Sequence, residues 1–133
     1  MREAPIAARS AWTRTRFDGR EVALLCGTIG AEFDTWQRRL SALSAADALL
    51  SQQIGLEAVE KVMDELEKKA KAEVEAEGRK MLPRKSPGYG DLPLALSRWI
   101  LDELDATKRI GVSITDSDLL VPSKSVTAIC EIC

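Results

Sequence analysis

A long helical pattern between Ser44 and Gly78 constrains the fold of this chain more than any other sequence feature. Ser44 can cap the first turn, because its hydroxyl can accept an amide proton there, and the Asp47 carboxylate favours the same end of the helix dipole. Gly55, in the middle, marks a kink or a close contact. The apolar residues recur three and four positions apart, which places them on one helical face: Leu50, Ile54, Val59, Val62, Met63, Leu66, Ala70 and Val74.

The residues before this helix predict a strand and a shorter helix. Glu21–Cys26 is a short apolar run closed by Gly27, which favours a buried strand. The basic stretch Arg14–Arg20 is interrupted by apolar and acidic residues, and it indicates a solvated strand or turn rather than a docking patch. A helix is expected over Ala31–Leu43, because its apolar side chains share one face: Phe33, Trp36, Leu40 and Leu43.

The segment after the long helix differs from it in composition. Met81–Pro93 contains three prolines and two glycines, which exclude a continuous helix and predict a structured loop. Asp91 is expected to cap a third helix that fades near Lys108. The apolar positions of that helix again share a face: Leu96, Trp99, Ile100 and Leu104.

The C-terminal tail predicts two strands, Ile110–Thr115 and Ser125–Ile132, with a short extended piece at Leu119–Val121 that Pro122 ends. Strands and helices are grouped along the chain rather than regularly alternating. The predicted fold class is therefore α+β, with an antiparallel or mixed sheet packed with three helices.

Length and charge narrow the classes of function. A chain of 133 residues suits one compact unit, and we expect residues 1–133 to form a single domain. Lys and Arg total 19 against 21 Asp and Glu, so the chain lacks the basic field of a generic nucleic-acid-binding protein. No apolar run approaches the roughly 20 residues that span a bilayer, and Met1–Ala11 lacks the apolar stretch of a signal peptide. These features predict a cytoplasmic protein with neither nucleic-acid nor membrane partners.

The chain contains no histidine, which removes the commonest general base near neutral pH and every His-ligated metal site. Any chemistry must rely on carboxylates, thiols, a bound cofactor or positioning. Cys130 and Cys133 have a spacing at which two thiolates can bind one metal ion. Four ligands are usually needed, and Cys26 is the one further cysteine in the sequence. The alternative to a metal or iron–sulfur role is a buried strand cysteine followed by a mobile terminal one.

Three ordered blocks give the chain a specific resemblance. They are Arg84–Pro93 (Arg-Lys-Ser-Pro-Gly-Tyr-Gly-Asp-Leu-Pro), Lys108–Ser117 (Lys-Arg-Ile-Gly-Val-Ser-Ile-Thr-Asp-Ser) and Val121–Ile129 (Val-Pro-Ser-Lys-Ser-Val-Thr-Ala-Ile). Together with the Cys26-Gly-Thr-Ile-Gly30 turn, they resemble the S-adenosylmethionine-binding activation domain of cobalamin-dependent methionine synthase. The similarity covers roughly Val22–Ile129. The loop matches the stand-alone branch of that family, and the chain is short at its N-terminus relative to the family.

The resemblance implies a set of ligand-binding residues. In the family an Arg-x-x-x-Gly-Tyr segment lines the S-adenosylmethionine site, and here it corresponds to Arg84, Gly88 and Tyr89, with Lys85 and Pro87 between them. The arginine meets the methionine carboxylate, for which a planar guanidinium fork is suited, and the glycine allows close approach of the backbone. A helical glutamate near the ligand corresponds to Glu60.

The implied function is positioning rather than autonomous catalysis. In the full synthase, the activation domain holds S-adenosylmethionine over a cobalamin that is reduced by one electron and then methylated. The sulfonium already carries its leaving group, so orientation is the main requirement and no general base is needed. The implied partners are a corrinoid-binding protein or the methionine synthase core, which carries the cobalamin, and an electron donor such as flavodoxin.

Two alternatives to this function remain open. The chain could be a non-catalytic interaction subunit of a corrinoid methyltransferase that kept the fold and lost ligand binding, as its shortened N-terminus suggests. It could instead be a cysteine-based redox or iron–sulfur protein, as Cys130 and Cys133 suggest. Ligand titration, partner capture and metal analysis distinguish the three readings.

Overall fold

The structure, a computed structural model, describes residues 3–133. Its centre is an antiparallel sheet of three strands in the order β1-β2-β5, formed by Arg9–Phe17, Arg20–Thr28 and Ser125–Glu131. The predicted strands at Glu21–Cys26 and Ser125–Ile132 are confirmed. The basic stretch that was expected to form a solvated strand or turn lies in the β1–β2 hairpin.

The hairpin turn explains why β1 lies beside β2. Phe17 pairs with Arg20, so only Asp18 and Gly19 connect the strands, and both have positive φ, 52° and 77°. Such a two-residue turn matches the twist of the flanking strands, and Asp-Gly is a preferred sequence for it. The predicted elements include β2 but only the last residues of β1, because the position of β1 depends on this turn and its pairing with β2.

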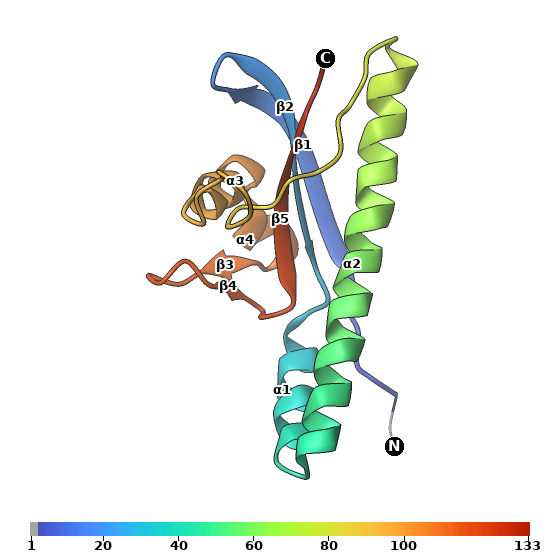
Figure 1. Ribbon diagram of the computed structural model, residues 1–133, viewed down its shortest axis with the longest axis vertical. Coiled ribbons are helices and arrows are strands. Elements are labelled where there is room, and N and C mark those ends of the chain that lie inside the picture. The colour runs from blue at the N-terminus through green and yellow to red at the C-terminus, as the bar shows by residue number, and fades with distance from the viewer. Residues whose placement is uncertain (1–2) are drawn as a thin grey trace.

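Helices cover both faces of the sheet (Figure 1). The long helix α2, Ala45–Ala76, lies on one face, and α3, Leu96–Leu104, with the short α4, Ala106–Ile110, lies on the other. Leu24 and Cys26 of β2 pack with Ile100 in one core, whereas Ala23 and Leu25 pack with Met63 and Leu66 in a second. Burial on both faces explains why β2 reads as a continuous apolar run.

Helix α2 begins as predicted, since the Asp47 amide donates to Ser44 Oγ at 3.0 Å. The apolar face is buried from Val59 to Val74. Leu50, which was assigned to that face, is instead 45% exposed, and the small residues Ser51 and Gly55 are buried there. Periodicity alone therefore misplaced the N-terminal part of the face.

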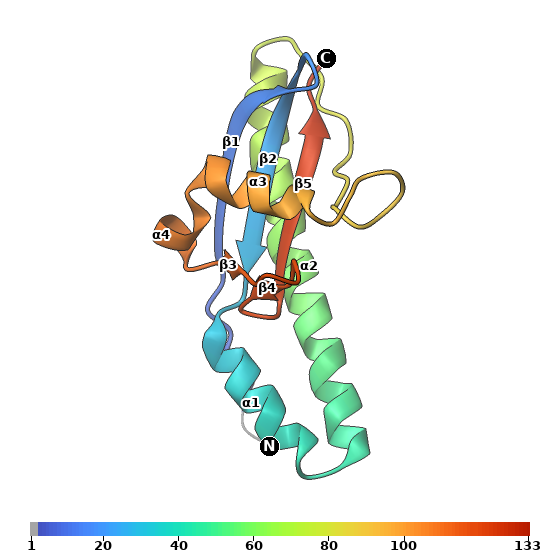
Figure 2. The same cartoon turned by 90° about the vertical axis from the view of Figure 1, so that its left-hand side faces the viewer.

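The reason for these small residues is the packing of α1, Ala31–Ser41, against the N-terminal part of α2. The two helices form a hairpin that extends beyond the end of the sheet (Figure 2). A Cβ atom on Gly55 would lie 2.7 Å from Phe33 Cε1 and 2.8 Å from Lys124 Cε. Of the two roles considered for Gly55, close contact is the one that the structure shows.

The segment between α2 and α3 is a structured loop, as predicted, and it runs along the outer edge of β5. Met81 forms a bridge with Ile132, and Lys85 forms one with Ile129, in which each residue's amide donates to the other's carbonyl at 2.9 Å. These contacts attach the loop to the sheet. They fix the position of the backbone from Met81 to Lys85.

The predicted third helix differs in its beginning and its length. Helix α3 begins at Leu96 with no side-chain cap, so the predicted cap by Asp91 is wrong. Asp105 has a φ of 52° and separates α3 from α4, which makes four helices among residues 3–133 instead of three. The predicted strand at Ile110–Thr115 is only β3, Ser113–Ile114, which pairs with β4, Leu120–Val121, outside the main sheet.

The α+β prediction is confirmed, and the main sheet is antiparallel throughout. Within residues 3–133, none of the helices combines the length and hydrophobicity that crossing a membrane requires.

Candidate functional site

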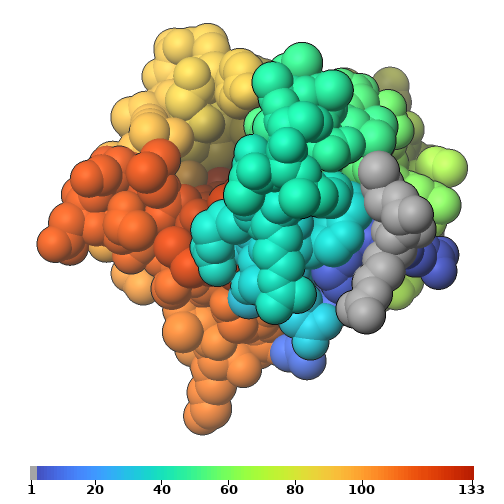
Figure 3. All heavy atoms as spheres, turned by 90° about the horizontal axis from the view of Figure 1, so that it is seen from below, coloured from blue at the N-terminus to red at the C-terminus, as the bar shows by residue number. Residues whose placement is uncertain are grey.

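A groove of about 950 Å³ lies between α2, the loop that precedes α3, and the beginning of β5. The first turn of α3 and the chain on either side of β4 complete its walls. In the space-filling view from below, the molecule is hollowed between α2, residues 85–95 and the β3–β4 segment (Figure 3). Small-molecule sites typically have volumes of roughly 300–1,000 Å³, so the groove is large enough for a nucleotide-sized ligand.

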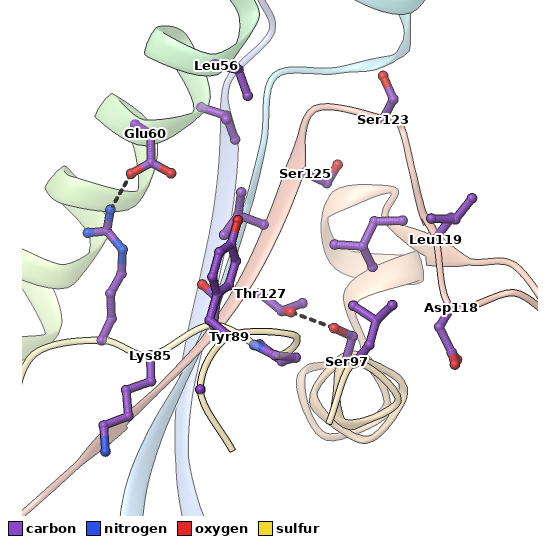
Figure 4. A pocket seen from close by; sticks show the side chains of 18 of the residues that line it. Leu56, Glu60, Lys85, Tyr89, Ser97, Asp118, Leu119, Ser123, Ser125 and Thr127 are labelled. Carbon is purple, nitrogen blue, oxygen red and sulfur yellow. Dashed lines mark hydrogen bonds and ion pairs between the residues drawn. The ribbon is translucent and has the colours of Figure 1, made fainter. Parts of the chain in front are cut away.

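Five of the six residues that the sequence singled out line this groove: Glu60, Arg84, Lys85, Pro87 and Tyr89. Glu60 comes from α2 and the other four from the loop, so tertiary packing brings together residues that lie more than 20 positions apart. The Tyr89 ring stands in the mouth of the groove and is 77% exposed (Figure 4). Their roles toward a ligand stay predictions, whereas their common location is a property of the fold.

Gly88 is the sixth residue, and it does not line the groove. Its φ is +92°, and its amide donates to the Leu92 carbonyl at 2.9 Å. A side chain would be strained at that φ, and its Cβ would lie 3.3 Å from Leu94 Cδ1. Gly88 therefore shapes the loop that presents Tyr89, and its close approach to a ligand stays a prediction.

Arg84 is held by α2. Its Nη2 donates to Glu60 at 2.8 Å, and its Nη1 donates to Asp64 at 2.9 Å and to Glu67 at 2.6 Å. The three carboxylates follow one another at helical spacing, so a single side chain from the loop bridges about two turns of α2. The Arg84 side chain is only 17% exposed as a result.

These contacts set the charge at this end of the groove. Partial burial lowers the pKa of the Arg84 guanidinium, but hydrogen bonds to Asp64 and Glu67 outweigh burial and raise it overall. Arg84 faces three carboxylates, of which only Glu60 lines the groove; the other charged residues of the lining are Lys85, Asp91 and Asp118. A guanidinium has five N–H donors, and none of the hydrogen bonds among residues 3–133 uses the donor on Nε or the second one on Nη2.

The opposite side of the groove carries hydroxyl groups that the sequence reading did not assign to a site: Ser97, Ser123, Ser125 and Thr127. Three of them fall within the block Val121–Ile129 that supports the resemblance, which was the available signal. Ser97 comes from α3, and nothing in its local sequence marks it. Asp34 of α1 fixes the nearby chain, because its carboxylate accepts the Ser123 amide at 2.9 Å and the Ser123 hydroxyl at 2.6 Å.

Large apolar side chains surround the mouth of the groove. Leu56 from α2, Leu94 from the loop and Leu119 from the β3–β4 turn are 45%, 47% and 62% exposed, and Tyr89 stands among them. Single exposed apolar residues are normal on a surface, but a group around a concave site is typical of an interaction surface.

The cysteines lie in unrelated environments. Cys26 and Cys130 belong to the cores on opposite faces of the sheet, and Cys133 is exposed. Burial raises the pKa of the Cys26 thiol to about 12, and burial together with the nearby Glu67 charge does the same for Cys130. Within residues 3–133, no group of three or more potential Cys, Asp or Glu ligands is arranged to hold a metal ion.

Comparisons of sequence and of structure give different results. No protein-family model matches the chain, and no curated protein matches it. The crystal structure of the MetH reactivation domain bound to AdoHcy superimposes with a TM-score of 0.70 and covers 84% of this chain. The chain has the fold of the MetH reactivation domain.

Sequence identity to the MetH reactivation domain is 18%, so the similarity lies in the fold. The chain spans 39% of the length of that structure's chain, and thus corresponds to a part of it. This match confirms the predicted α+β architecture like that of the activation domain. AdoHcy, the demethylated product of S-adenosylmethionine, is the ligand of that MetH structure.

Proposed function

We propose that this chain binds S-adenosylmethionine in the groove and positions its methyl group for reductive methylation of a corrinoid cofactor carried by a partner protein. The observation that carries the proposal is the meeting of Glu60, Arg84 and Tyr89 in one groove of suitable size. The partner would be a methionine synthase core or another corrinoid-binding protein, with an electron donor such as flavodoxin. The fold of the MetH reactivation domain supports the choice of ligand.

The groove has the chemistry that this ligand requires. S-adenosylmethionine supplies an electrophilic methyl group and its own leaving group, so the protein contributes binding and orientation. The free N–H donors of Arg84 suit the ligand's carboxylate. The carboxylates that line the groove, Glu60, Asp91 and Asp118, suit the cationic sulfonium and ammonium groups.

The apolar mouth gives the same groove a second role. A methyl group can be transferred only if the partner's corrinoid approaches the open side of the site, so ligand site and docking surface must coincide. Leu56, Leu94 and Leu119 surround that opening with apolar surface. Tyr89 adds a large, exposed and rigid ring of the kind enriched at the centres of interfaces.

A second candidate function is a non-catalytic interaction subunit that has lost ligand binding. One observation favours it, which is that Arg84 already makes ion pairs with three carboxylates. A ligand carboxylate must therefore share the guanidinium with Glu60, Asp64 and Glu67 or displace one of them. This competition does not arise at an arginine that is free to bind.

Calorimetric titration of the purified chain with S-adenosylmethionine separates the two candidates. Saturable binding supports the proposed function, and its absence supports the interaction subunit. The chain alone should not methylate homocysteine, and methylcobalamin should form only when a corrinoid protein and a low-potential reductant are added. Turnover by the isolated chain would contradict the positioning role.

Tyr89→Ala tests whether the groove is also the docking surface. Because Tyr89 is 77% exposed, its removal should reduce methylation of the corrinoid protein more than it reduces S-adenosylmethionine binding. Both quantities are measured on one preparation. Parallel losses would make Tyr89 a ligand contact only, and no loss in either would place the docking surface elsewhere.

A further inference from the structure

One pair of hydroxyl groups in the groove is buried and incompletely hydrogen-bonded. Ser97 Oγ on α3 and Thr127 Oγ1 on β5 lie 2.9 Å apart, and each residue is only 3% exposed. Both side chains line the groove. Figure 4 shows the pair on the far side of the Tyr89 ring from the Glu60–Arg84 contact.

The Ser97–Thr127 pair has more hydrogen-bonding capacity left than the neighbouring hydroxyls do. Each hydroxyl has one O–H donor and two acceptor lone pairs, and one O–H is used between Ser97 and Thr127. Among residues 3–133, the structure shows no hydrogen bond from the other O–H. The pair therefore presents one buried donor and several lone pairs to the groove.

The other two hydroxyls on this side already have internal acceptors. Ser123 donates to Asp34 at 2.6 Å, and Ser125 Oγ lies 2.7 Å from the Pro122 carbonyl oxygen. Both oxygens of the pair have one partner, and a further hydrogen bond between neutral groups contributes roughly 0.5–1.5 kcal/mol. The unused O–H of the Ser97–Thr127 pair is therefore the position on this side where a ligand acceptor gains most.

Apolar side chains line the same groove as the pair. They include Leu94, Leu119 and Leu120. A planar heteroaromatic ring fits this environment, because its faces can bury against leucine side chains while its edge offers adjacent acceptor and donor atoms. A sugar diol would place polar groups against the leucines instead.

We propose that the Ser97–Thr127 hydroxyl pair holds the edge of the purine base, with a ring nitrogen accepting the free O–H and the exocyclic amine donating to a hydroxyl oxygen. This inference rests on the proposed function, since it names the contact for the base of the same ligand. The amino-acid part then lies toward Arg84, on the α2 side of Tyr89. Ser97 and Thr127 are accordingly specificity-determining residues for the nucleoside.

Thr127→Val tests the proposal, because it removes the hydroxyl and keeps the shape of a strand side chain. AdoHcy and an analogue that lacks the 6-amino group are titrated calorimetrically into the wild type and the variant. The wild type should bind the analogue about 3- to 10-fold more weakly than AdoHcy, the range for a neutral hydrogen bond. Thr127→Val should bind AdoHcy more weakly by a similar factor and should discriminate little between the two ligands.

Thr15→Val is the matched control, since Thr15 lies on β1 and does not line the groove. It should preserve both affinities and their ratio. If Thr127→Val unfolds, Ser97→Ala replaces it in the same comparison. Retention of the wild-type ratio by the Thr127 or Ser97 variant would overturn the base assignment alone, whereas failure of the wild type to bind AdoHcy would overturn the proposed function and this inference with it.

Discussion

Replacement of Arg84 by alanine tests the centre of the proposed site. Arg84 uses Nη1 and part of Nη2 on the carboxylates of α2 and keeps donors on Nε and Nη2. If these bind the ligand's carboxylate, the variant loses a hydrogen bond to a charged group, worth about 1.5–3 kcal/mol. The dissociation constant for S-adenosylmethionine should therefore rise about 10- to 150-fold.

The same substitution also affects stability, and the two effects must be separated. Glu60, Asp64 and Glu67 lose their shared counter-charge and repel one another along α2. Exposed ion pairs contribute only about 0.2–1 kcal/mol each, and Glu60 and Asp64 are 58% and 64% exposed. We expect a loss of about 1–2 kcal/mol in the free energy of unfolding, dominated by the less exposed Glu67, which leaves the protein folded.

Calorimetry at low and high salt measures the affinity, and urea denaturation measures the stability. Arg79→Ala is the control, because Arg79 also pairs with a carboxylate, Glu21, but lies outside the groove. It should lose some stability and keep its affinity. Arg84→Lys should recover only part of the affinity, since an ammonium keeps the charge without the planar fork. Equal affinities of wild type and Arg84→Ala would refute the assignment of this arginine.

Three further predictions concern packing and the thiols. Gly55→Ala should lower the free energy of unfolding by about 1–2 kcal/mol in urea denaturation, because crowding against Phe33 outweighs the gain in helix propensity; unchanged stability would show that Phe33 moves aside freely. Alkylation of the native protein, followed by mass spectrometry, should modify Cys133 and spare both buried cysteines. Those two thiols hold their protons more tightly in the folded state, so their contribution to stability should persist below pH 9.0 and decline as the pH rises toward about 12.

Local sequence signals were sufficient to predict several of the elements. The α2 face from Val59 to Val74, the Ser44 cap and the buried strand β2 all follow from residues within a few positions of one another. The loop that supplies Arg84 and Tyr89 could also be predicted, because prolines and glycines exclude a helix there. Its chemistry was recognisable because those residues are neighbours in the chain.

How these elements meet depends on contacts between residues that lie far apart in the chain. Arg84 faces three carboxylates of α2 because the loop that carries it is attached along β5, next to that helix. No local sequence pattern specifies this contact. Ser97 and Thr127 are 30 residues apart and meet because α3 packs on the face of the sheet opposite α2. Phe33 of α1 packs closely against Gly55, and this contact sets which face of α2 meets α1. Leu50 lies outside that face and is exposed. Periodicity identifies which face of an element is apolar, but packing between elements decides which side chains touch, and that packing depends on the whole chain.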